Sequence, residues 1–265
     1  MKRGQVSVFV VIGIIALAII LLVFFFRNSI VETIRHEPTN YQDYLGQQLD
    51  DIKREVGKCV TQETNNAIDL LIKNGGDFRR DFGYINYINI TYPILCREIN
   101  ATQSCLFQPI LISEMKDKLN KKLTQDIKKC INLKSFKNKD YVLTSGNLDV
   151  SSNILNDKIV VDIDMPIKLM KDSYIVESKN MIYSLDIPLG ELIKLANDLV
   201  QIKAGGSEIN PLLYNILHYN KYFIEVRKPY PDEIYVVWII GKEKYKFYFA
   251  IEGIGRYERP GGRIR

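Results

Sequence analysis

Histidine and tryptophan are scarce in this chain, which has two histidines and one tryptophan among 265 residues. Neither His36 nor His218 has a second ligand at metal-binding spacing, and we expect His218 to be partly buried and hydrogen-bonded. The sequence also lacks the G-x-S-x-G, H-E-x-x-H and P-loop motifs. These absences argue against a histidine-based metal centre, a serine-hydrolase elbow and a phosphate cradle. No catalytic residue, metal or cofactor is therefore assigned.

A pair of carboxylates is the remaining candidate for a catalytic site. Asp162 and Asp164 alternate with apolar residues, so both side chains should point to the same face of a strand. We interpret this face as solvated. A hydrolase site assembled from dispersed residues such as Asp162, Asp164 and Glu177 is kept as the second alternative.

Cysteine is also rare, and its placement is informative. The four cysteines lie between positions 59 and 130 without a C-x-x-C motif, which favours two disulfides in an oxidising compartment. Four cysteines allow three connectivities. We predict Cys59 with Cys130, because both lie on apolar faces of predicted helices, and Cys96 with Cys105, which are nine residues apart. The alternative is a cytoplasmic domain with four free, buried cysteines.

Two N-x-[ST] sequons flank Cys96. They begin at Asn89 and Asn100, where we expect exposed loop or strand edge, and each is a possible glycosylation site in an extracellular domain. Together with the cysteines, they favour an ectodomain outside the cell.

Residues Val6 to Phe26 form a run of 21 residues without a charge or a proline. As a helix this run would be about 31 Å long, which matches a hydrocarbon core of about 30 Å. Lys2 and Arg3 precede it and favour a cytoplasmic N-terminus. We therefore predict a transmembrane anchor over residues 1–27 that contacts the lipid bilayer.

The rest of the chain divides by composition and periodicity. Pro38 marks a juxtamembrane hinge over residues 28–40. Residues 41–135 form a Cys-bearing helical region, with one amphipathic helix from Tyr41 to the Gly75-Gly76 pair, an irregular loop with short strands, and a second helix capped by Ser113. Cys130 should join the apolar line of that second helix.

Residues 136–252 are predicted to form an antiparallel sheet with helices. From about Asn147 apolar residues alternate with polar ones through a three-strand meander, and a C-terminal hairpin turns at Gly241-Lys242. A helix spans 190–203, and Asn210-Pro211 begins a shorter one. The predicted fold class is α+β: an N-terminal transmembrane helix, then amphipathic helices packed on an antiparallel β-meander and a C-terminal hairpin.

The net charge is only +5, so we expect no nucleic-acid partner. Residues 253–265 are read as a flexible, solvated basic tail.

The opening string KRGQVSVFVVIGIIALAII resembles the class III signal sequences of archaeal type IV pilin-like proteins. The resemblance implies cleavage after Gly4, which would leave Gln5 as the new terminus. Pilins usually carry Glu at the fifth mature position, whereas this chain has Phe9. More of the chain resembles a group of uncharacterised archaeal single-pass membrane proteins in which a similar anchor precedes a Cys-bearing helix ending in Gly-Gly.

These patterns predict a membrane-anchored extracytoplasmic envelope protein, in the cell membrane with its ectodomain extracellular. We expect a structural or interaction role without catalysis, with other envelope proteins as partners. The first alternative is a type IV pilin-like filament subunit.

Overall fold

The computed structural model describes residues 40–78, 83–98, 105–137 and 140–253, together with positions 13, 16, 17 and 21. Among these residues, no helix has the length and apolar character needed to cross a membrane. Several predictions lie outside the described residues. They concern Gly4, Gln5, Phe9, most of Val6 to Phe26, the hinge before residue 40, His36, Asn100 and the tail after residue 253.

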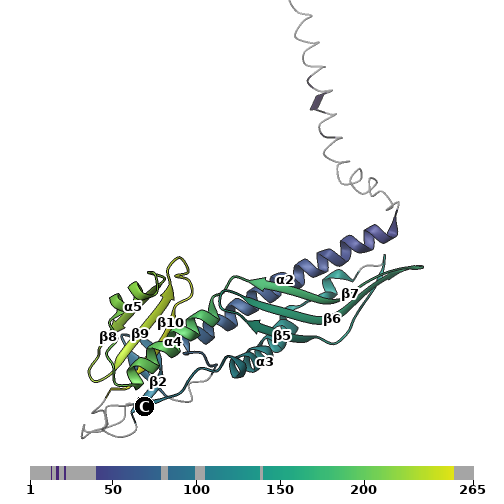
Figure 1. Cartoon of the computed structure of the whole chain (residues 1–265). Helices are drawn as coiled ribbons and strands as arrows, with labels where there is room; N and C mark the ends of the chain where they lie inside the picture. Colours follow the sequence, from purple (N-terminus) through teal and green to yellow (C-terminus); the bar gives the residue numbers. More distant parts are fainter. Residues whose placement is uncertain are drawn as a thin grey trace, which may run out of the picture.

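Helix α2, Tyr41–Lys73, is the longest of the described helices and runs from one end of the folded part toward its middle (Figure 1). Asn40 caps its first turn, because its side chain accepts a hydrogen bond from the Gln42 N–H at 3.0 Å. At about 1.5 Å per residue the helix is about 50 Å long. Its buried stripe has the predicted three- and four-residue spacing and consists of Leu45, Leu49, Ile52, Val56, Cys59, Val60, Thr64, Ala67, Ile68, Leu71 and Ile72.

The predicted glycine pair ends α2. Gly75 and Gly76 both have positive φ, a backbone conformation that side chains disfavour. A Cβ atom on Gly75 would lie 2.6 Å from Cγ of Pro93, and one on Gly76 would lie 2.9 Å from Cγ2 of Ile110. The chain therefore needs glycine here both to turn and to pack closely against the next segments.

Helix α3, Ile112–Cys130, packs against α2 through Met115, Leu119, Leu123 and Ile127. The prediction of Ser113 as the N-cap was wrong, since the helix begins before it and Leu111 occupies the cap position without a side-chain hydrogen bond. The prediction that Cys130 joins the buried line was wrong, since Cys130, the last residue of the helix, is exposed, whereas Cys59 is buried. A short 3₁₀ helix, Leu133–Phe136, follows.

The predicted meander is present as β5, Asp149–Ile154, β6, Ile159–Lys171, and β7, Tyr174–Leu185, all antiparallel. An unexpected strand, β4, Val142–Ser145, pairs with the second half of β6. Pro166 lies between the two pairings, where its carbonyl accepts a hydrogen bond from the Gly146 N–H at 2.7 Å. The buried face of β6 alternates as predicted.

The second sheet has six strands. The order is β1, Tyr84–Tyr87, β2, Ile90–Glu98, β10, Phe247–Ile251, β9, Glu233–Ile239, and β8, Tyr222–Arg227, with β3, Cys105–Phe107, also paired to β2. The predicted C-terminal hairpin is β9–β10. However, β2 pairs in parallel with β10, so this sheet is mixed rather than purely antiparallel. Strands from the predicted regions 41–135 and 136–252 thus share one sheet.

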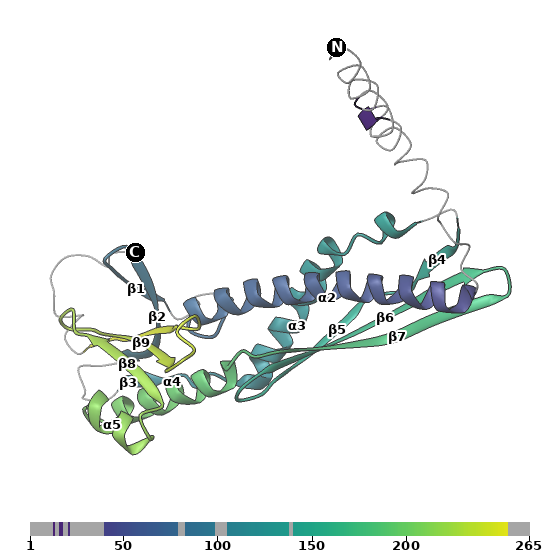
Figure 2. The same cartoon turned by 90° about the horizontal axis from the view of Figure 1, so that it is seen from above.

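Two further helices complete the α+β fold: α4, Leu189–Ala204, and α5, Pro211–Leu217. Figure 2 shows β6 and β7 alongside the first half of α2, and β8, β9 and α5 at its other end. One hydrophobic cluster joins residues of α2, α3, α4 and both sheets. A smaller cluster in the second sheet, made of Ile85, Tyr92, Ile94, Ile234, Val236 and Ala250, is separate from this main core.

Truncation of Leu123 to alanine tests this core. Leu123 is fully buried, so Leu123→Ala should lower the free energy of unfolding by about 2–5 kcal/mol. Leu155→Ala is the matched control, because Leu155 is exposed and its truncation should cost less than about 0.5 kcal/mol. Chemical denaturation followed by circular dichroism measures both, and equal losses would contradict the packing described.

Candidate interaction site

Helix α5 begins as the sequence predicts. The side chain of Asn210 accepts hydrogen bonds from the N–H groups of Leu212 and Leu213, both at 3.1 Å, and Pro211 occupies the first turn. Proline suits this position because the N–H that it lacks would have no partner within the helix. The segment from Asn210 onward is therefore a well-capped short helix.

The inner face of α5 packs on β8 through aromatic rings. The rings of Tyr214 and His218 stack with centroids 4.1 Å apart, and both lie near Tyr222. His218 is partly buried and its Nδ1 lies 2.8 Å from the Tyr214 carbonyl, which confirms the expected environment. The Asn215 side chain accepts a hydrogen bond from the Tyr222 N–H at 3.0 Å. These contacts fix which face of α5 points outward.

The outer face of α5 is apolar and exposed. We call this patch, together with the residue after the helix cap, the α5 surface. Its exposed fractions are 70 % for Leu212, 53 % for Leu213, 55 % for Ile216, 66 % for Leu217 and 95 % for Tyr219. Clustered exposure of this kind marks interaction sites, whereas single exposed leucines are ordinary.

Tyr219 is held outward by an unusual backbone. Its φ is 57°, and that of Asn220 is 55°, so two consecutive residues adopt the left-handed conformation. This conformation is uncommon for a bulky residue such as tyrosine and often accompanies function.

The chain around the α5 surface carries almost no charge. No Asp or Glu occurs from position 209 to position 224, and Lys221 is the only Lys or Arg in that stretch. The ammonium of Lys221 forms an ion pair with Glu191 of α4. The α5 surface thus lies within a nearly neutral segment of 16 residues.

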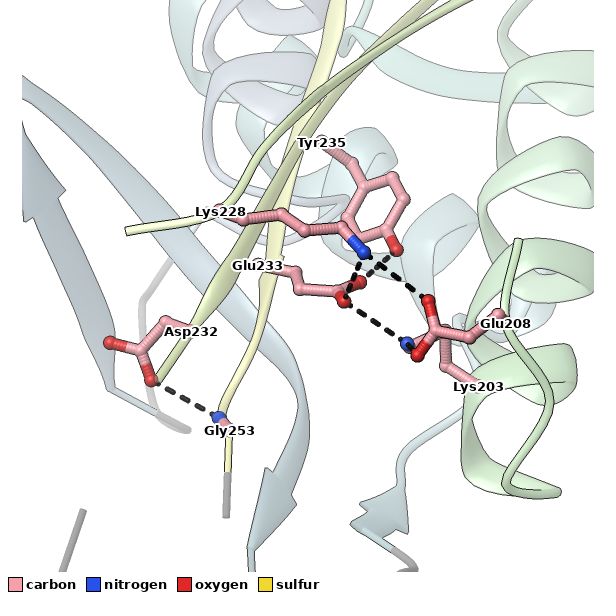
Figure 3. Close-up of polar contacts among 7 residues, drawn as sticks. All are labelled: Lys203, Glu208, Lys228, Asp232, Glu233, Tyr235 and Gly253. Carbon is pink, nitrogen blue, oxygen red and sulfur yellow. Dashed lines mark hydrogen bonds and ion pairs between the residues drawn. The ribbon is translucent and has the colours of Figure 1, made fainter. Parts of the chain in front are cut away.

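A charged cluster fastens the loop that leads to α5 (Figure 3). Nζ of Lys203, at the end of α4, lies 2.9 Å from Glu208 and 3.1 Å from Glu233. Nζ of Lys228 lies 3.2 Å from Glu208 and 3.3 Å from Glu233. The hydroxyl of Tyr235 donates a hydrogen bond to Glu233. Because Glu208 comes two residues before the Asn210 cap, the cluster ties the base of α5 to the second sheet.

The carboxylates of the charged cluster are held in their ionised form. Burial raises the pKa of Glu233, but hydrogen bonds from Tyr235 and Lys203 and the nearby lysine charges outweigh it, so the pKa lies below its ordinary value. Hydrogen bonds from Lys203 and Lys228 lower the pKa of Glu208. Burial and the bond to Glu233 raise the pKa of Tyr235.

The charged cluster is suited to holding the loop before α5 against the second sheet and is not suited to proton transfer. A general acid needs a raised carboxyl pKa, and both carboxyl pKa values are lowered. Beside the cluster, the side chain of Asp232 accepts a hydrogen bond from the Gly253 N–H at 3.1 Å, which ties the start of β9 to the end of β10 (Figure 3).

The cysteines form two disulfides, Cys59 with Cys130 and Cys96 with Cys105, which are the pairs expected from the sequence. The Cα–Cα distances are 5.9 Å and 5.4 Å. The first ties α2 to the end of α3, and the second ties β2 to β3. Asn89 is exposed in the turn between β1 and β2, the kind of position expected for it from the sequence.

The carboxylates considered for a hydrolase site lie on two paired strands, β6 and β7. Asp162 is half-buried and Asp164 is exposed on β6, while Glu177 lies opposite Lys168 beyond an irregularity in the β6–β7 pairing. Within the part of the chain that the structure describes, no group of three or more His, Cys, Asp or Glu side chains could hold a metal ion.

Two cavities in the described part of the molecule are small. One of about 150 Å³ lies at the glycine pair after α2, and one of about 190 Å³ borders the Cys59–Cys130 disulfide. Small-molecule sites usually measure about 300–1,000 Å³. The α5 surface is therefore the stronger candidate for function.

No protein-family model, curated protein or solved structure matches this chain. Sequence reasoning identified α5 and its apolar residues but missed their exposure. The sequence feature that could have pointed to an exposed apolar surface was the absence of acidic residues from 209 to 224.

Replacing Lys203 tests the charged cluster. Its side chain is only 13 % exposed, so Lys203→Met should lower the free energy of unfolding at neutral pH by about 2 kcal/mol. Since folding lowers the pKa of Glu233, this stability is present above the ordinary value of 4.5 and is lost as pH falls through the folded value. The difference between Lys203→Met and the parent should therefore shrink in acid.

Lys228→Met is the control for this measurement. The Lys228 side chain is 60 % exposed, and its loss should cost less than about 1 kcal/mol. Denaturant titrations across acid and neutral pH compare the three proteins. A Lys203→Met deficit that stays constant with pH would argue against the ion pairing described.

Proposed function

We propose that this chain is a membrane-anchored extracytoplasmic envelope protein with a structural or interaction role. In this proposal Val6 to Phe26 crosses the bilayer once, the N-terminus is cytoplasmic and the ectodomain is extracellular. The observation that carries the proposal is the pair of disulfides, which persist in oxidising compartments and are rare in the cytosol. Lys2 and Arg3 before the apolar run support the orientation.

The interaction role is supported by the α5 surface. A short helix that is capped, packed on one face and fastened at its base presents four aliphatic side chains to solvent. Monomeric soluble proteins rarely expose large contiguous apolar patches unless they bind something. The partners proposed are other proteins of the envelope.

A type IV pilin-like filament subunit is the second candidate. The KRGQVS prefix favours it, and so does the packing of the long helix α2 against an antiparallel sheet. Phe9 stands where pilins usually carry Glu, which favours an anchor over a filament core.

Thiol counting tests the extracytoplasmic placement. All four cysteines of the native protein are disulfide-bonded in this proposal, so a maleimide should add no mass to the protein under denaturing conditions without reductant. After reduction it should add four equivalents, one for each cysteine. Intact-mass spectrometry reads both states, and four reactive thiols before reduction would refute the placement.

Replacing Gly4 tests the filament candidate. If a membrane peptidase cuts after Gly4, the native protein should begin at Gln5 and a variant with a bulky residue at position 4 should keep its four leading residues. N-terminal sequencing of both proteins from their native host measures this. An unprocessed native protein would rule out the pilin-like candidate while leaving the anchored one intact.

A further inference from the structure

We infer that the α5 surface binds the α5 surface of a second copy of this chain. The inference rests on the interaction role proposed above and names the partner. Three observations carry it: the area exposed, the lack of charge and the place of α5 in the molecule.

The exposed area suits a protein partner. At roughly 100–200 Å² for a fully exposed side chain, the exposed fractions give the α5 surface about 350–700 Å² per molecule, and a standard-size interface buries about 800 Å² per partner. Residues around the α5 surface would have to supply the remainder. Two aliphatic helix faces with a tyrosine at the edge also match the composition of homodimer interfaces, whose cores are more apolar than other surfaces.

The charge distribution favours a second copy over an anionic lipid surface. A two-fold contact places each residue near its own equivalent, so any net charge on the patch would repel itself. The segment 209–224 avoids this because its only Lys or Arg is Lys221, which is already paired with Glu191. Helices that lie on anionic membranes instead carry several lysines or arginines on their polar face.

The position of α5 leaves it accessible to another copy. It lies at the same end of the molecule as β8 and β9, away from β6 and β7 (Figures 1 and 2). The charged cluster ties the base of α5 to β9 through the largely buried Lys203–Glu233 pair. Binding therefore needs no rearrangement of the core, which keeps the entropic cost of association low.

Cysteine cross-linking of the full chain in its native membrane tests the contact. All native cysteines are paired, so Leu213→Cys introduces the only free thiol. Near a two-fold axis the two thiols come together, and a short bis-maleimide should shift the protein from 30.7 kDa to a dimer band on a non-reducing gel. Ile182→Cys is the matched control, because Ile182 is 69 % exposed on β7, away from α5, and should stay monomeric.

A second substitution separates specific contact from collision. Leu217→Lys combined with Leu213→Cys should reduce the dimer band by about tenfold or more, because the interface would then bury an unpaired ammonium. Equal cross-linking with and without Leu217→Lys would overturn the inference. A Leu213→Cys protein that stays monomeric would also overturn it, including when a photoreactive lipid labels α5 instead.

The same variants keep the two proposals apart. A membrane-impermeant maleimide added outside intact cells should label Ile182→Cys if the ectodomain is extracellular. Labelled Ile182→Cys with no Leu213→Cys dimer would defeat the inference and leave the placement standing. A Leu213→Cys dimer formed by a permeant cross-linker, with Ile182→Cys unlabelled from outside, would defeat the placement alone.

Discussion

Burial of the apolar stripe along α2 is the constraint on which the rest of the structure depends. Over about 50 Å the helix contacts α3, the β6–β7 sheet and β10 of the second sheet. At Gly57 a Cβ atom would lie 2.7 Å from the ring of Tyr183, whose hydroxyl donates to the Lys53 carbonyl at 2.9 Å. Helix α2 is therefore the one helix that packs against strands of both sheets, while α3 adds to the cover of the first sheet and α4 to that of the second, among the contacts of the described residues. The Cys59–Cys130 disulfide then fixes α3 beside it.

The exposed α5 surface follows from how the second sheet is supported. Helix α4 packs against β2, β3, β9 and β10, and the charged cluster joins its last turn to β9. Helix α5 follows α4 and packs on β8 through its Tyr214 and His218 side. Its leucines remain outside. Lys203 and Glu233 therefore connect the candidate site at α5 to the second sheet, and no pocket is involved in this connection.

Local patterns predicted most of the elements, because the helices and the meander each bury one face at a regular period. The parallel pairing of β2 with β10 could not be predicted, since it depends on contacts more than 150 residues apart in the chain. Strand β4 was not predicted. It pairs with the second half of β6 and β5 pairs with the first half, and Pro166 of β6 lies between the two pairings. The exposure of Leu212 and Leu217 could not be predicted from the sequence either. Helical spacing shows that leucines share a face, whereas tertiary packing decides whether that face is covered.

The central claim is that α2 unites both sheets in one cooperative core. Native-state hydrogen exchange at increasing denaturant, read by mass spectrometry, tests this claim most directly. The core predicts that the amides of β6 and of β9 lose protection together, with the same free energy of opening as those of α2. Loss of protection in β9 and β10 at a clearly lower free energy, with β6 and α2 still protected, would show two independent units and contradict it.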